Sequence, residues 1–255
     1  MKHLMRVALI SLFAVATNAS AGAISDVGSN AYWGGNNHGY GDVIGTSMYD
    51  ISGATIGVAG NTLTIRIATN FAGHAGADTW AAAKGIGYGD LFLASAWKPS
   101  GTDAHHGNDT AALGTLWSYG LNLDNRWSNT GGSFTLYELN GASNASNVLN
   151  SQSFLSCAIG TQCYYRDGQA TAVNTASTSV RNTGLTGSWS VAQDAALTFT
   201  INIGGTSLLR YDEMAMHWGE TCQNDVIEGI TDVPEPAGLA LFALGLLGVA
   251  LRRKA

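Results

Sequence analysis

The chain is constrained most strongly by a two-residue alternation of apolar and polar side chains. In the segment NTLTIRIAT, Leu63, Ile65 and Ile67 occupy every second position, and polar residues stand between them. Successive side chains of a β-strand point to opposite faces, so this alternation predicts a half-buried strand. Alternation, or an apolar run of strand length, recurs in segments 89–97, 132–141, 187–205 and 207–219.

Turn-forming residues separate these segments, and no comparable helical periodicity accompanies them. Glycine provides 33 of the 255 residues, well above its usual share of about 7%. Many short antiparallel strands joined by turns are typical of sandwiches. We therefore expect an all-β fold, with a single antiparallel, jelly-roll-like β-sandwich domain over residues 22–230. The polar segments 140–153 and 166–184 are predicted to be loops, and one strand is expected within the second, near residues 171–173.

The first 21 residues have the order of a secretory signal peptide. Basic Lys2 and Arg6 precede an apolar run over residues 7–16, and Ala19-Ser20-Ala21 follows. A charged start, a short apolar core and small residues at an A-x-A site direct export and cleavage. We expect cleavage after Ala21, so the mature protein is predicted to be exported.

The last 25 residues, 231–255, contain a second apolar segment. The run from Ala237 to Leu251 would span about 22 Å as a helix, less than the ~30 Å hydrocarbon core of a bilayer. Basic Arg252 and Arg253 follow at once, which favours arrest with the end on the cytoplasmic side. The segment is therefore predicted to be a short hydrophobic helix that anchors the chain in the membrane transiently.

The order of this tail resembles the PEP-CTERM sorting signal. Its elements are the VPEP at 233–236, the apolar helix and the terminal RRK. The resemblance implies a bacterial substrate of an exosortase-type processing enzyme at the inner membrane. Sorting would use Pro234, Glu235 and Pro236 with the basic Arg252 and Arg253, and would deliver the protein to the cell surface or extracellular matrix. Such proteins are associated with exopolysaccharide and biofilm. The body is similar to uncharacterised exported PEP-CTERM proteins, which implies no activity.

Without its two ends, the body is strongly acidic. Residues 22–233 hold seven Lys and Arg against 17 Asp and Glu, a formal charge of about −10. No basic patch is present, so we expect no nucleic-acid partner. Such a charge suits divalent cations or neutral glycans. Calcium is the candidate cofactor, because it takes carboxylates and carbonyls from turns, and Asp side chains that only cap turns are the alternative. The calcium candidates are Asp42, Asp90, Asp225 and Glu228.

Aromatic residues supply the candidate glycan site. The chain has seven tryptophans, of which Trp97, Trp189 and Trp218 stand in strand patterns and are expected in the core. The segment SNAYWGGNNHGYGD differs, because aromatic residues alternate there with Gly and Asn as in an exposed binding loop. Tyr32, Trp33 and Tyr40 are therefore the predicted glycan-binding residues.

The three cysteines fit an exported protein, in which disulfides are permitted. Cys157 and Cys163 stand six residues apart and are predicted to form a disulfide across a hairpin. Cys222 would then remain as a buried free thiol.

Catalytic groupings are not evident. There is no G-x-S-x-G elbow. His217 has acidic Glu213 and Glu220 nearby in sequence, but it stands in a core pattern and is expected to be structural. The protein is therefore predicted to be a non-enzymatic, exopolysaccharide-associated component. The alternatives are a polysaccharide-acting enzyme, which would need two carboxylates roughly 5–10 Å apart, and a calcium-stabilised structural surface protein.

Overall fold

The computed structural model describes residues 21–26, 47–101, 109–156 and 168–233. Twelve strands are the main regular structure in this part of the chain, which confirms the all-β prediction. They are β1 (Gly22–Ser25), β2 (Ile51–Ala59), β3 (Thr62–Thr69), β4 (Leu91–Ala94), β5 (Tyr119–Leu123), β6 (Gly131–Leu139), β7 (Val148–Asn150), β8 (Ala170–Val173), β9 (Val180–Ala192), β10 (Ala196–Asn202), β11 (Glu213–Gly219) and β12 (Val226–Asp232). The described helices are single turns: η2 (Ser47–Tyr49), α1 (Asn144–Asn147), η3 (Ser151–Ser153) and η4 (Ser207–Arg210).

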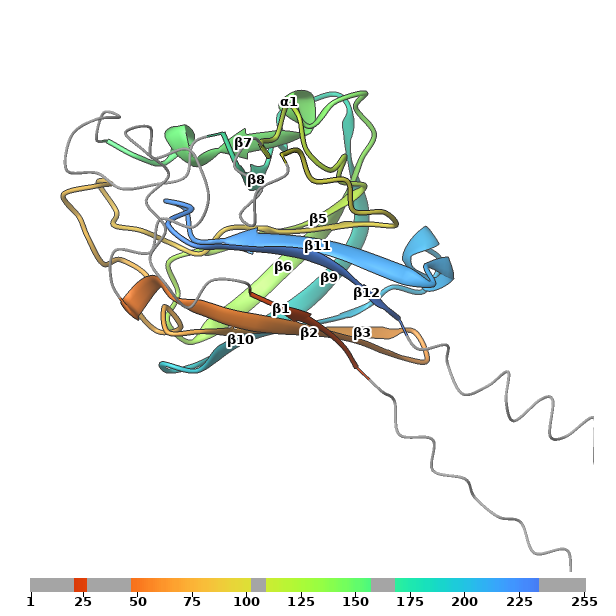
Figure 1. Cartoon of the computed structure of the whole chain (residues 1–255), viewed down its shortest axis with the longest axis horizontal. Coiled ribbons are helices and arrows are strands. Elements are labelled where there is room, and N and C mark those ends of the chain that lie inside the picture. Colours follow the sequence, from red (N-terminus) through yellow and green to blue (C-terminus); the bar gives the residue numbers. More distant parts are fainter. Residues whose placement is uncertain (1–20, 27–46, 102–108, 157–167, 234–255) are drawn as a thin grey trace, which may run out of the picture.

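Ten strands form one antiparallel sheet in the order β1-β2-β3-β10-β9-β6-β5-β4-β11-β12. The sheet curves so that its two end strands, β1 and β12, lie against each other (Figure 1). Glycine permits this approach, since a Cβ on Gly229 would lie 2.8 Å from Ile24 Cγ2. The two layers predicted for a sandwich are therefore parts of one continuous sheet that almost closes into a barrel.

The alternation seen in the sequence fills the space between the two layers. Ile65 of β3 pairs with Phe199 of β10, and Phe199 pairs with Trp189 of β9. All three side chains are buried in the main core. Apolar burial contributes roughly 25 cal/mol per Å², so the alternating face of each strand holds the sheet in its curved form.

A second, smaller core lies on the outer face of β4, β5 and β11. The two-stranded sheet β7-β8 covers that face (Figure 1), and Phe92, Ala215 and Val173 are buried beneath it. All four residues of β4 are therefore buried, and all of β11 after Glu213. This double burial explains why the MAMHWG stretch is apolar on both faces.

The loop prediction for 166–184 is only partly right. The strand expected near 171–173 is confirmed as β8. The residues from Val180 onward are not a loop, because they form the first part of the 13-residue strand β9. That part pairs with β6 around an irregularity in register between Thr135 and Tyr137, which removes the alternation that would reveal a strand.

Candidate functional site

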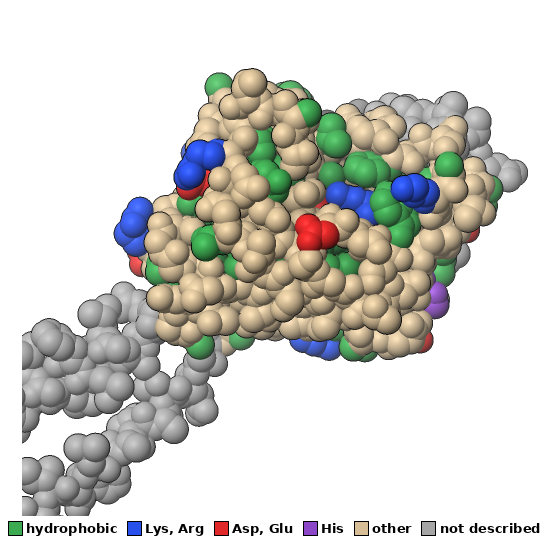
Figure 2. Space-filling view, turned by 180° about the vertical axis from the view of Figure 1, so that it is seen from behind, with side chains coloured by type: hydrophobic (Ala, Val, Ile, Leu, Met, Phe, Trp, Pro, Cys, Tyr) green, Lys and Arg blue, Asp and Glu red, His purple; other side chains and the backbone are tan. Residues whose placement is uncertain are grey.

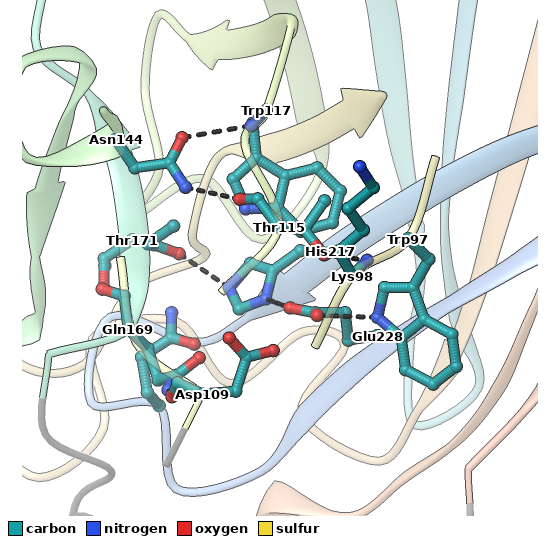
Figure 3. Close-up of polar contacts among 12 residues, drawn as sticks. Trp97, Lys98, Asp109, Thr115, Trp117, Asn144, Gln169, Thr171, His217 and Glu228 are labelled. Atoms are coloured by element: carbon teal, nitrogen blue, oxygen red, sulfur yellow. Dashed lines mark hydrogen bonds and ion pairs between the residues drawn. The ribbon is translucent and has the colours of Figure 1, made fainter. Parts of the chain in front are cut away.

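A cluster of titratable and aromatic side chains is buried on the outer face of the sheet, beside the second core. His217 of β11 and Glu228 of β12 are direct partners in the antiparallel register, so both side chains point to the same face. Trp97 comes from the chain after β4, and Asp109 from the chain before β5. These four residues, here named the His217 cluster, meet in Figure 3 although they come from distant parts of the sequence.

Both nitrogens of the His217 ring are bonded. Nε2 lies 2.7 Å from the Ala170 carbonyl oxygen, which can only accept, so Nε2 carries a proton. Nδ1 lies 2.7 Å from Glu228 Oε2. Trp97 Nε1 donates to Glu228 Oε1 at 2.7 Å (Figure 3). The imidazole is thereby fixed between β8 and β12, as predicted for a structural histidine, although its acidic partner is Glu228.

Glu228 is the charged centre of the cluster. Burial raises its pKa, but the hydrogen bond and positive charge of His217, with hydrogen bonds from Asp109 and Trp97, outweigh burial and hold the pKa below its ordinary value. The cluster therefore holds the Glu228 carboxylate largely out of bulk water.

Amide side chains fix the backbone around this cluster. Asn144 accepts a hydrogen bond from the Trp117 backbone N–H at 3.0 Å and donates to the Thr115 carbonyl. Gln169 Nε2 donates to the Asp109 carbonyl. The Trp117 ring lies 5.7 Å from the His217 ring, centroid to centroid. The cluster is consequently rigid, with its polar atoms directed at protein partners.

This geometry does not match the carboxylate pair expected of a glycoside hydrolase. Asp109 and Glu228 are in hydrogen-bond contact, whereas hydrolysis requires roughly 5–10 Å between the two carboxyl groups. The arrangement can hold and shift a proton, and it can fix β12 against β11, β4 and β8.

A second feature is an exposed aromatic surface, here named the tryptophan turn: residues 78–85 with Trp127 packed on them. The Trp80 side chain is 59% exposed, and its Nε1 donates to Asp78 Oδ1 at 3.0 Å. Lys84 Nζ lies 4.9 Å from the centre of the Trp127 ring, whose Nε1 donates to the Gly85 carbonyl at 3.1 Å. Figure 2 shows hydrophobic and basic side chains together on a face that is otherwise mainly uncharged.

The predicted calcium residues that the structure describes take part in separate networks. Asp90 is buried and accepts hydrogen bonds from Arg126 Nη2 at 3.1 Å, Asn122 Nδ2 at 2.8 Å and two backbone N–H groups. Asp225 is buried and accepts from the backbone N–H of Ile51 at 2.7 Å. Glu228 belongs to the His217 cluster. Within the described ranges, no three His, Cys, Asp or Glu side chains converge on one point.

The predicted cysteine Cys222 is a buried free thiol, as expected. Several other predicted residues lie outside the described part of the chain. They are Tyr32, Trp33, Tyr40, Asp42, Cys157, Cys163, Pro234, Glu235, Pro236, Arg252 and Arg253. Sequence reasoning did not single out Trp80 or Trp127, because neither follows a strand pattern.

The tail has a counterpart among known protein families. Residues 232–254 match the family model of the PEP-CTERM protein-sorting motif. The chain carries a PEP-CTERM sorting signal. This signal marks an exported protein that exosortase processes and sorts to the surface. Neither the curated proteins nor the solved structures include a match to the chain. Within its described part, no helix has the length and apolar character to cross a membrane.

Proposed function

We propose that the body of this PEP-CTERM protein is a non-enzymatic component of the cell surface or extracellular matrix that binds polysaccharide. The observation that carries the proposal is the exposed Trp80 on a protein sorted to the surface. Leaving a large aromatic side chain in water forgoes roughly 1.5–3 kcal/mol of burial. A partner that covers the ring recovers that free energy.

The chemistry of the tryptophan turn suits a sugar chain. The apolar C–H face of a pyranose stacks on an aromatic ring, while its hydroxyl groups need polar neighbours. Asp78 fixes the Trp80 indole through Nε1 and leaves the ring faces free of that bond. Asp78 is an acceptor beside the Trp80 ring, and Lys84 is a donor over the Trp127 ring of the same surface. The binding surface would thus be largely formed before the sugar arrives.

The test compares two exposed apolar residues in polysaccharide retention. Matrix polysaccharide from the producing cells is immobilised, and the purified body is passed over it. Trp80→Ala should lower retention at least five-fold, about 1 kcal/mol, without changing the melting temperature. Leu113→Ala is the matched control, because Leu113 is 66% exposed but not aromatic, and it should bind as the unmodified protein does.

Equal retention by Trp80→Ala and the unmodified protein would contradict the assignment to the tryptophan turn. Trp33→Ala in the same assay tests the segment around Tyr32, Trp33 and Tyr40. A loss confined to Trp33→Ala would move polysaccharide binding to that segment. Full retention by both variants would argue against polysaccharide binding through either surface.

Delivery to this site of action requires the tail. The apolar run 237–251 inserts into the membrane transiently, and exosortase then processes the chain near Pro234 and Pro236. The short apolar length supports this proposal, because a helix of about 22 Å is a poor permanent anchor in a core of ~30 Å.

A further inference from the structure

Acidic residues gather at one end of the barrel, here named the acidic end. Asp26 follows β1, Asp50 precedes β2, and the 220–225 connection joins β11 to β12 with Glu220 and Asp225 in it. The antiparallel order brings the end of β1, the start of β2 and this connection to the same end. The hydrogen bond from the Ile51 N–H to Asp225 Oδ2 joins two of these segments directly.

Glu220 is the unusual member of the group. Its side chain is fully buried, and neither carboxyl oxygen has a hydrogen bond of normal geometry from the described residues. Burial raises its pKa well above the ordinary value; the backbone N–H groups of Glu220 and Asp225 oppose this rise, and the negative charges of Asp26 and Asp50 add a smaller increase. Among the described residues, no ion pair supplies a compensating positive charge to this carboxyl group.

Two amide side chains of the same connection also have buried oxygen atoms without a hydrogen bond in the described part of the chain. Gln223 Oε1 and Asn224 Oδ1 are buried and have no donor among the described residues. The Gln223 side chain is held in place, because its Nε2 donates to the Glu220 carbonyl at 2.9 Å, and its backbone adopts φ 54°. Three polar residues of one connection, Glu220, Gln223 and Asn224, therefore hold buried side-chain acceptors without a hydrogen bond of normal geometry from the described residues. Buried acceptors without donors are rare in native proteins and usually indicate a missing partner.

We propose that the 220–225 connection binds a divalent cation of the calcium type, with Glu220, Gln223 and Asn224 as side-chain ligands. Carboxylate and amide oxygens are the ligands that Ca²⁺ takes from loops. Asp26, Asp50 and Asp225 supply the surrounding negative charge. This ligand set combines one carboxylate with two amides, which is why no cluster of three acidic, His or Cys side chains marks it in the described residues.

A soft-metal site is less consistent with the same residues. Cys222 stands in the connection, but its side chain packs in the main core, and burial raises the pKa of its thiol well above the ordinary value. Zinc sites in proteins are built mainly from Cys thiolates and His nitrogens. The oxygen atoms of Glu220, Gln223 and Asn224 favour the hard cation.

The test measures thermal stability and ion binding in the purified body after treatment with EDTA. Adding 1 mM CaCl₂ (about 100 times an expected Kd) should raise the melting temperature by roughly 5 °C, and equilibrium dialysis should find one Ca²⁺ per chain. Glu220→Gln should melt at a higher temperature than the unmodified protein in EDTA at pH 7, because the buried carboxyl is gone. The same variant should not respond to CaCl₂.

Asn224→Ala is the second variant and should lower the calcium response even if Glu220→Gln fails to fold. Glu138→Gln, which changes an acid of a surface ion pair on β6, is the matched control and should respond fully. Absence of any calcium response in the unmodified protein overturns the proposal, as does an equal response in Glu220→Gln or a response to Zn²⁺ alone. None of these outcomes depends on polysaccharide binding.

Discussion

At the scale of single residues, Glu228 acquires its properties from the partners that the sheet places around it. Strand pairing places His217 directly opposite Glu228. Trp97, from another part of the chain, donates a hydrogen bond to the Glu228 carboxylate. The combined hydrogen bonds hold the Glu228 pKa below its ordinary value despite burial. A folded-state pKa below the unfolded value means that the ionised carboxylate stabilises the fold.

Glu228→Gln should therefore lower the free energy of unfolding by about 1–3 kcal/mol at pH 7, because the buried His217 and Trp97 rings lose their charged hydrogen-bond partner. The contribution of Glu228 is present above its unfolded pKa of about 4.3 and is lost as pH falls through the lower folded pKa. The difference between the two proteins should shrink as pH falls from 5 to 3. Urea unfolding at pH 7, 5 and 3 measures this difference.

The matched comparison for Glu228 is Glu138→Gln. Glu138 forms an ion pair with Arg181, whose side chain is 62% exposed, and such surface pairs contribute at most about 1 kcal/mol. Its loss should be small at every pH. A Glu228→Gln variant as stable as Glu138→Gln at pH 7 would show that the His217 cluster does not stabilise the fold.

At the scale of elements, the strands that could be predicted are those whose two faces differ. Leu63, Ile65 and Ile67 of β3 face the core while their neighbours face solvent, so alternation identifies the strand. β2 has a similar burial pattern, but Gly53 and Gly57 stand between its apolar residues and make the alternation of apolar and polar side chains harder to recognise. The first part of β9 is largely exposed and has no apolar face to recognise. Alternation therefore reports one-sided burial and misses strands that lack it.

The candidate sites were less predictable than the strands. Both His217 and Glu228 were visible in the sequence, but their pairing depends on the length of the 220–225 connection, which sets the register. Asp109 and Trp97 come from irregular segments whose positions follow only from tertiary packing. Glu220 could be seen as an acid near His217, yet its burial at the end of the barrel carries no local sequence signal.

A prediction at this scale concerns close approach between strands. A Cβ on Gly187 of β9 would meet the Phe134 ring and lie 2.6 Å from the Thr200 carbonyl oxygen. Gly187→Ala should therefore lower the free energy of unfolding by about 1–3 kcal/mol through overpacking. Thermal or urea unfolding of the purified body gives the value directly.

Gly57→Ala is the matched control within another strand of the same sheet. A Cβ on Gly57 would lie 3.6 Å from Ala21 Cβ, an ordinary contact. Alanine also lowers the conformational entropy of the unfolded chain, so this variant should be neutral or gain up to about 1 kcal/mol. If both variants lose the same stability, the contact with Phe134 is not the cause.

At the scale of the whole molecule, the tail and the tryptophan turn belong to opposite ends of the barrel. Glu213 pairs with Asp232 at the end from which the tail continues, while the 220–225 connection lies at the other end. Tyr88, just beyond the tryptophan turn, forms a bridge with Glu220, and Tyr49 donates to Asp78. A chain held by its tail would thus present the tryptophan turn at the far end.

Processing of the exported chain can be read from its mass. Protein recovered from the producing cells should begin near Gly22 and end near Pro234, because signal peptidase removes the first segment and exosortase the last. Intact-mass measurement distinguishes this product from the full chain. A recovered protein that retains Arg252 and Arg253 would contradict processing of the tail.

We propose that the processed body remains at the surface because it binds matrix polysaccharide. The most direct measurement treats intact cells with a polysaccharide-degrading enzyme and follows the protein between the cell-bound and released fractions. Degradation should release the processed body, and Trp80→Ala should already be largely released before treatment. A protein that stays cell-bound after its polysaccharide has been degraded would show that polysaccharide binding does not hold it at the surface.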